Sequence, residues 1–370
     1  MRIKGVVLIL VICLCGKSFG QTQKSDMEVL AKYIMAHQFS GEETNAMGAI
    51  WTFTIGTEDD TIYKVIPYFG HVAARGLLKT GVNNHSNVKS WMNWYIAHLD
   101  STGRAVNHYY HADGKTDSIV GPNDIDAQDA DPALFWMLAS EYFSATGDKM
   151  FFSRYVKGRL ETAEKFIADS LTDVDGLSFA NLDFAMKYTM DNAELYAGLN
   201  ALATIEKEVY KDNTRYSLYK TKAEKLQKAI ALRLFDPVSG IYKNSANMKT
   251  NPTHWYDEGV VATLWPQLCG VETYSSPSAT RQRDLLSQNF NEKNGKDWTG
   301  IKFVKDSIPV DTYPWASVGY IFSQAGDTTA GHKQLSYIIS FFKDPEMISH
   351  ININEAGWAL LHLATIYKKP

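Results

Sequence analysis

Hydrophobic residues recur along nearly the whole chain at the spacing of about 3.6 residues that places them on one face of an α-helix. This spacing predicts helices near residues 26–38, 66–80, 86–99, 131–146, 151–169, 191–210, 214–234, 256–268, 278–291, 313–325, 328–343 and 354–368. Strand-like alternation is confined to short segments at residues 49–55, 107–111, 240–244 and 300–304. We therefore expect an all-α protein with short β-hairpins in its loops.

Two kinds of helix alternate in this pattern. Every second helix, starting with the one near 66–80, is rich in small residues such as Gly70, Ala73 and Gly76. The helices between them carry a charged face, as Lys222 and Glu224 illustrate for the helix near 214–234. Small residues allow close packing on several sides, so we expect the first kind inside and the second kind outside.

The small-residue helices begin at regular distances, near residues 67, 131, 191, 257, 313 and 354. A period of about 60 residues is one helical hairpin with its loops, and such a period signals a closed or stacked array. The most economical architecture is an (α/α)6 barrel that takes in residues 21–370 as one catalytic domain. A linear helical solenoid is the alternative, but it would not favour polar residues at one end of its inner helices, as this chain does.

The first twenty residues have the pattern of a secretory signal. Arg2 and Lys4 give a positive start, residues 6–15 are apolar, and Ser18-Phe19-Gly20 resembles a cleavage site. The apolar run is too short to span a bilayer, which needs about 20 residues. We expect an exported protein, periplasmic or extracellular, with no membrane span after cleavage.

Charge and cysteine content narrow the class of protein. The formal net charge is −4, which argues against a nucleic-acid partner bound through a basic surface. Two of the three cysteines lie in the signal, so Cys269 stays alone and no intrachain disulfide can form. The fold must therefore be held by its hydrophobic core, in which we also expect Cys269.

Carboxylates and aromatic residues recur in the segments that lead into the inner helices, at residues 63–70, 124–132, 188–194, 254–259, 311–315 and 350–355. Inner helices of such a barrel run parallel, so these segments meet at one opening. Carboxylates can act on a glycosidic bond, and aromatic rings can stack on sugar faces. The pattern predicts a carbohydrate-binding cleft at this opening.

The candidate residues of this cleft fall into two groups. The candidate catalytic carboxylates are Asp129, Asp191, Asp257, Glu258 and Glu355. The candidate substrate contacts are Tyr68, Asp126, Tyr188, His254, Trp255, Tyr256, Tyr313 and Trp315.

Acidic residues at helix starts also have a structural interpretation, because they cap helices and favour the helix dipole. Asp131 before Pro132 has the pattern of an N-cap, and Asp191 with Glu194 has that of a capping box. Asp129 precedes the expected cap, so capping does not explain it. Glu355 could be a first-turn partner of the helix dipole.

Other chemistries have weaker support in the sequence. It contains no cysteine cluster, no His-Glu-x-x-His motif and no glycine-rich phosphate loop, so we expect no cofactor and no catalytic metal. A structural cation among the carboxylates of residues 126–131 stays open. His254 and His350 precede two inner helices and could act as an acid and base pair on a sugar carbon.

Several short motifs make the chain resemble the six-hairpin glycoside hydrolase superfamily. They are Pro67-Tyr68-Phe69, the segment of Asp126 and Asp129 with Thr146-Gly147-Asp148 after its helix, Met190-Asp191-Asn192-Ala193-Glu194, and Tyr313-Pro314-Trp315 with Ala325-Gly326-Asp327. This superfamily includes glucoamylases, trehalases and unsaturated glucuronyl hydrolases. The resemblance extends over residues 25–368.

The resemblance also implies roles. Glucoamylase-like and trehalase-like members point to Asp191 as the acid and Glu355 as the base, whereas unsaturated glucuronyl hydrolases would favour Asp129. A helix N-terminus lowers a carboxylate pKa, which suits Asp191 better as a base, so the two roles could be reversed.

We therefore expect a secreted glycoside hydrolase that uses two carboxylates, inverting if they lie about 6.5–9.5 Å apart. The alternatives are a sugar epimerase or isomerase using His254 and His350, a polysaccharide lyase, and a glycan-binding barrel without activity. The sugar, the linkage and the oligomeric state stay open.

Overall fold

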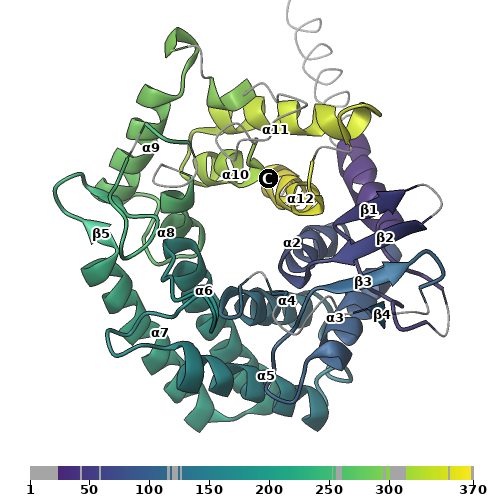
Figure 1. Cartoon of the computed structure of the whole chain (residues 1–370). Coiled ribbons are helices and arrows are strands. Elements are labelled where there is room, and N and C mark those ends of the chain that lie inside the picture. Colours follow the sequence, from purple (N-terminus) through teal and green to yellow (C-terminus); the bar gives the residue numbers. More distant parts are fainter. Residues whose placement is uncertain are drawn as a thin grey trace, which may run out of the picture.

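Two rings of helices, one inside the other, form the protein (Figure 1). The computed structural model describes residues 24–41, 44–57, 60–114, 117–118, 124–125, 127–251, 253–255, 261–294, 297–300, 314–348 and 351–367. The closed ring confirms the predicted all-α (α/α)6 barrel and excludes a linear solenoid.

The inner ring consists of the helices that the sequence marks as rich in small residues. They are α2 (Pro67–Leu78), α4 (Ala130–Thr146), α6 (Thr189–Ile205), α8 (Trp265–Leu268), α10 (Ala316–Gln324) and α12 (Ile353–Tyr367). A short 3-10 turn, Ala262–Leu264, leads into α8. Of the helix predicted near 256–268, the structure therefore shows helical turns from residue 262 onward, and residues 256–260 lie outside the described part of the chain.

The outer ring consists of the helices with a charged face. They are a helix over residues 24–36, α3 (Ser86–His98), α5 (Arg154–Phe166), α7 (Asn213–Arg233), α9 (Pro277–Asn289) and α11 (Thr328–Lys343). Two π-helical turns, Ile167–Leu171 and Glu206–Tyr210, continue α5 and α6. Polar side chains cap α5, α7, α9 and α11: each accepts a backbone N–H from its own helix, as caps do. They are Ser153, Asp212, Ser276 and Asp327.

Glycines allow the inner ring to close between its first and last helices. A Cβ atom on Gly76 of α2 would lie 2.4 Å from the carbonyl oxygen of Gly357 of α12. A Cβ on Gly357 would lie equally close, 2.4 Å, to the carbonyl oxygen of Val72. Because no larger side chain fits there, the small residues of α2 and α12 let the two helices lie side by side (Figure 1).

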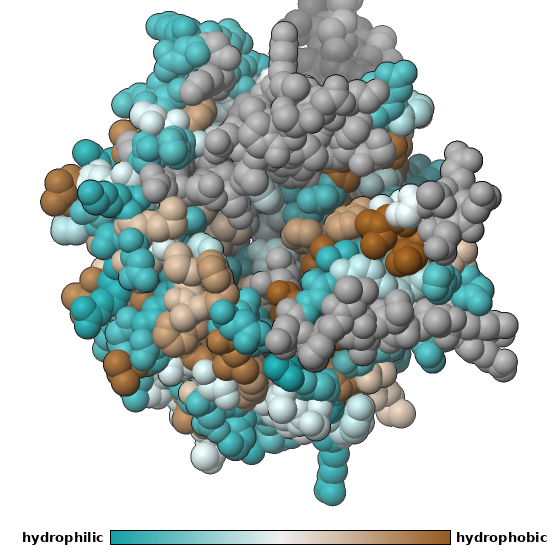
Figure 2. Space-filling model, viewed as in Figure 1, coloured by the Kyte–Doolittle hydropathy of each residue, from teal (hydrophilic) through white to brown (hydrophobic). Residues whose placement is uncertain are grey.

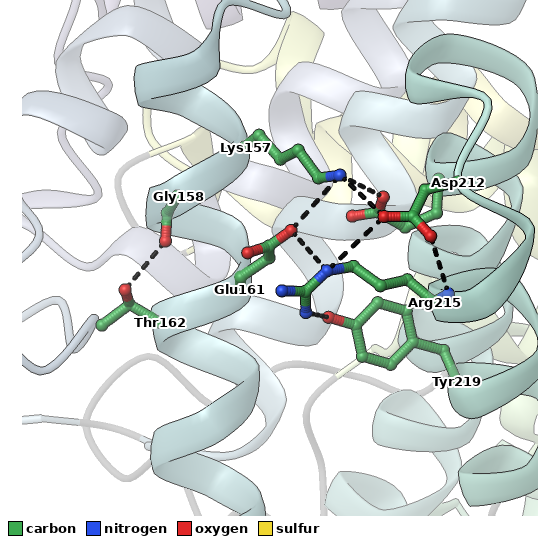
Figure 3. A network of polar contacts seen from close by, with 8 residues as sticks. Lys157, Gly158, Glu161, Thr162, Asp212, Arg215 and Tyr219 are labelled. Carbon is green, nitrogen blue, oxygen red and sulfur yellow. Dashed lines mark hydrogen bonds and ion pairs between the residues drawn. The ribbon is translucent and has the colours of Figure 1, made fainter.

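An ion-pair network fastens the outer helix α5 to α7 (Figure 3). The Nζ atom of Lys157 lies 3.1 Å from the carboxylates of both Glu206 and Asp212. The Nε atom of Arg215 lies 2.9 Å from Glu161. These acids therefore all have a cation within reach.

A small antiparallel sheet lies beside α2 and α3 (Figure 1). Its strands follow the order β1 (Phe53–Thr57), β2 (Asp60–Val65), β3 (His108–His111) and β4 (Asp117–Ser118). A second hairpin pairs β5 (Phe235–Asp236) with β6 (Ile241–Tyr242). The alternation at residues 49–55, 107–111 and 240–244 matches β1, β3 and β6, whereas residues 301–304 lie outside the described segments. Strand β2 was not predicted as a strand, because its apolar residues run directly into the pattern of α2.

The rest of the core follows the predicted pattern. Cys269 is a free, buried cysteine within it. In the described segments, no helix is both long enough and apolar enough to cross a membrane.

Candidate active site

The N-terminal ends of the inner helices surround a cavity of about 550 Å³. Tyr68 and Phe69 reach it from α2, Met190 and Asp191 from α6, and Trp265 from α8. Ala127, Trp315, Asn354 and Trp358 contribute from the starts of α4, α10 and α12. Figure 2 shows the surface hollowed at the centre of the ring. The segments that lead into the inner helices thus meet at one place.

The cavity combines aromatic rings with a few polar groups. Its rings are Tyr68, Phe69, Phe184, Tyr188, Trp265, Trp315 and Trp358, and its polar side chains other than the tyrosines and tryptophans are Asn181, Asp191, Asn244 and Asn354. Volume and lining are typical of a site for a small ligand, where apolar walls hold the molecule and a few polar groups orient it. Flat rings and hydrogen-bonding groups together suit a sugar.

Asp191 is the acidic residue among the described lining residues of the cavity. It lies in the first turn of α6, whose N-cap is Tyr188, and no side chain caps this helix. The capping box predicted for Asp191 and Glu194 is therefore wrong. The half-buried Asp191 carboxylate instead acts on its neighbours, because its charge contributes to raising the pKa of both Asp129 and Glu194.

Asp129 is the N-cap of α4, a role that the sequence assigned to Asp131. Its carboxylate accepts the backbone N–H of Ala130 at 2.9 Å, and its side chain is fully buried. Burial, followed by the charge of Asp191, holds the pKa of Asp129 well above its usual range. Asp131 lies in the first turn instead and accepts a hydrogen bond from the Tyr95 hydroxyl at 2.8 Å. Asp129 therefore has a structural role that the sequence did not predict, next to Asp191.

Glu355 lies in the first turn of α12 and is fully buried. Its Oε2 accepts the N–H of Ala316, the first residue of α10, at 2.6 Å, and its Oε1 accepts the Asn354 amide at 3.0 Å. Burial raises the pKa of Glu355 to about 8, although both hydrogen bonds act to lower it. Glu355 thus binds the start of the neighbouring helix. It does not itself line the cavity, but its sequence neighbour Asn354 does.

Glu194 is the titratable group that sequence reasoning missed, since it was considered only as a capping partner. It is 1% exposed and accepts hydrogen bonds from Tyr68 and Trp265, which both line the cavity. Burial and then the charge of Asp191 raise its pKa to about 8. No local pattern marks such an environment, because both donors come from other helices.

Three of the predicted substrate contacts line the cavity: Tyr68, Tyr188 and Trp315. Trp255 does not, and this prediction is corrected: its side chain is 1% exposed and packs in the hydrophobic core against Phe290, with ring centroids 5.1 Å apart. His254 is exposed and is not part of the cavity lining. The remaining candidates lie outside the described residues: Asp126, Tyr256, Asp257, Glu258, Tyr313 and His350.

Several lining residues were not among the candidates. Trp265 and Trp358 lie inside helical patterns, where a tryptophan is usually part of the core. Loop residues such as Phe184 and Asn244 belong to no recognisable pattern. In the part of the chain that the structure describes, no three histidine, cysteine or acidic side chains are grouped to hold a metal ion.

Comparison with known proteins finds similar structures but no similar sequences. No protein-family model and no curated protein sequence matches the chain. Among solved structures, a glycosidase variant in complex with glucose is 12% identical, with 93% of this chain and 97% of that chain covered and a TM-score of 0.65.

Two further solved structures share the arrangement. The GH63 mannosylglycerate hydrolase of Thermus thermophilus in complex with glucose is 11% identical, covers 93% of this chain and 99% of its own, and has a TM-score of 0.59. A bacterial glucoamylase complexed with acarbose is 14% identical, covers 82% of this chain and 48% of its own, and has a TM-score of 0.53. At this identity the likeness concerns the fold, and the chain has the (α/α)6 fold of the six-hairpin glycosidases.

Proposed function

We propose that this protein is an exported glycoside hydrolase that cleaves oligo- or polysaccharides in the cavity at the inner helix starts. The observation that carries the proposal is the cavity itself: aromatic walls around the Asp191 carboxylate, next to the start of α12 with the buried Glu355. The fold shared with a glucose-bound glycosidase and a glucoamylase supports the same class of substrate. The signal pattern of residues 1–20 supports export.

The two carboxylates differ in the form that their surroundings favour. Burial raises the pKa of Glu355 to about 8, so it holds a proton at neutral pH and suits a general acid. Asp191 lies in the first turn of α6, where the helix dipole favours the ionised form that a base needs. We therefore assign Glu355 as the acid and Asp191 as the base, the reverse of the order that the superfamily resemblance implies.

We further propose that the enzyme inverts the anomeric configuration. An inverting glycosidase uses a protonated acid and an ionised base on opposite faces of the sugar ring, and these are the forms assigned here to Glu355 and Asp191. The two residues belong to α12 and α6, the sixth and the third of the inner helices, which lie across the ring from each other (Figure 1). This placement supports a separation with room for a water.

The test is a reducing-end assay of residues 21–370 on a panel of oligosaccharides and polysaccharides, with Asp191→Asn and Glu355→Gln. Asp169→Asn on the exposed surface serves as the matched control. We expect one glycan to be cleaved, both site variants to be inactive while folded, and the control to be active. Proton NMR of the first product then shows an inverted anomer. Full activity of both site variants would reject the assignment.

A further inference from the structure

One oxygen of Glu194 joins three inner helices at the wall of the cavity. Glu194 belongs to α6, and its Oε1 accepts the Tyr68 hydroxyl of α2 at 2.7 Å and the indole N–H of Trp265 of α8 at 2.8 Å. Both donors line the cavity. The positions of two aromatic walls therefore depend on one carboxyl group, which is itself 1% exposed.

The other oxygen of Glu194 is arranged differently. Oε2 is buried and has no hydrogen-bond partner among the described residues. No lysine or arginine forms an ion pair with Glu194 in the described part of the chain, although the more distant charge of Arg75 acts to lower its pKa. Burial and the charge of Asp191 outweigh this and raise the pKa to about 8, so the group is protonated at neutral pH. Since Oε1 already accepts two hydrogen bonds, the proton belongs on Oε2.

We propose that Glu194 is a positioning residue, which holds Tyr68 and Trp265 as fixed walls for a sugar ring and, as a neutral group, spares Asp191 a second negative charge nearby. This inference rests on the proposed function, because it takes the ligand of the cavity to be a sugar. Like Glu355, Glu194 is not among the lining residues, but both of its hydrogen-bond donors are aromatic walls of the cavity, so it acts through them.

Fixed walls matter for affinity because a ring that is held in place loses no freedom when a sugar binds. Without the acceptor, the tyrosine hydroxyl and the indole N–H would each need a new partner, and both rings could turn. An uncharged acceptor is sufficient for this role. The role therefore predicts that glutamine, which keeps a carbonyl oxygen and cannot ionise, replaces Glu194 well, and that alanine does not.

The test compares Glu194→Gln and Glu194→Ala with the wild type in two measurements. The first is the infrared band of protonated carboxyl groups at neutral pH, from which Glu194→Gln removes the contribution of Glu194. We expect this difference between wild type and variant to disappear as the pH passes about 8. The second is glucose binding followed by calorimetry, together with KM for any glycan that is cleaved. We expect Glu194→Ala to weaken binding and raise KM at least about tenfold, with kcat changed less, and Glu194→Gln to stay within about threefold.

Tyr68→Phe is the matched control, since it keeps the ring and removes one of the two hydrogen bonds. We expect its glucose affinity to lie between those of Glu194→Gln and Glu194→Ala. Unchanged binding and KM in folded Glu194→Ala would overturn the proposal, as would an infrared difference without a carboxyl band. Glucose binding with this pattern but no glycan cleavage would leave Glu194 as a positioning residue and reject the hydrolase. A wild type that neither binds glucose nor cleaves a glycan would overturn both.

Discussion

Acidic side chains of the inner helices have opposite surroundings at the two ends of the barrel. At the N-terminal end, Glu194 and Glu355 have no cation beside them among the described residues, and burial raises the pKa of each to about 8. Toward the C-terminal end of α2, Arg75 and Lys79 lie 2.7 and 2.9 Å from the carboxylate of Glu141. Burial acts to raise the pKa of Glu141, but these two cations lower it further than burial raises it.

The difference separates acids that hold the barrel together from acids that are available for chemistry. A paired carboxylate such as Glu141 has a lowered pKa and is ionised, and Asp212 in the outer network has the same property (Figure 3). An unpaired buried carboxylate costs stability when it ionises, and perturbed groups of this kind cluster at functional sites. A glutamate therefore has a lowered pKa at the C-terminal end and a raised pKa at the N-terminal end.

The largest expected effect of breaking this contrast is on activity. We expect Glu355→Gln to lower kcat by about 100- to 10,000-fold, because the neutral amide cannot donate a proton to the leaving group. Glu141→Gln should retain the wild-type kcat per folded molecule. Initial rates on the glycan found in the panel, corrected for the folded fraction by circular dichroism, check both. Equal kcat losses in the two variants would contradict the proposed division between the ends.

We expect the free energy of unfolding to show the opposite contrast, with the larger loss at the C-terminal end. Glu141→Gln leaves Arg75, whose side chain is 9% exposed, without its ion-pair partner, and we expect the free energy of unfolding to fall by about 2–4 kcal/mol. Urea unfolding at neutral pH measures this, and Glu194→Gln is the matched substitution at the other end. A loss for Glu194→Gln as large as for Glu141→Gln would show that the cation makes no difference.

The dependence of stability on pH sharpens the comparison. The folded pKa of Glu194, about 8, lies above the ordinary value of 4.5, so its contribution to the unfolding free energy is retained below about pH 4.5 and lost as the pH rises toward 8. Glu141 has a lowered pKa, so its contribution is present above its unfolded pKa and lost as the pH falls.

Glu194→Gln should therefore gain about 2 kcal/mol relative to the wild type between about pH 6 and pH 8. Urea unfolding at a series of pH values measures this gain. A difference between the two proteins that stays constant over this range would mean that Glu194 is ionised throughout.

The smallest effect is expected outside the cavity. His254 is exposed and is not among the lining residues, so His254→Ala should change kcat/KM less than about threefold. The same reducing-end assay checks this. Loss of activity in a folded His254→Ala variant, with Glu355→Gln still active, would instead favour the histidine-based isomerase that the sequence left open.

Much of the fold was predictable because it depends on local pattern. The helical spacing predicted helix α7, found at Asn213–Arg233, and helix α11, found at Thr328–Lys343, within a residue or so. The small residues of α2 and α12 predicted close packing, and Gly76 and Gly357 do allow the two helices to meet. The weakest prediction was α8, whose regular helix is only Trp265–Leu268.

The candidate site was predictable only in part. The segments that lead into the inner helices do meet around one cavity, and Tyr68, Tyr188, Asp191 and Trp315 line it. Trp255 follows the same segment pattern, yet it packs in the core. A pattern of residue types can place a residue at a helix start, but it does not set the direction in which the side chain points.

The sequence by itself determined the helices, their alternation between inner and outer positions, and the end of the barrel at which polar residues gather, because helical spacing connects residues only three or four positions apart. Only the tertiary structure decided which acids lack a cation. Tyr68 is 126 residues from Glu194, Trp265 is 71 residues from it, and Ala316 is 39 residues from Glu355. Contacts over such separations form when the ring closes, and a carboxyl group acquires its burial, its donors and hence its pKa from that closure.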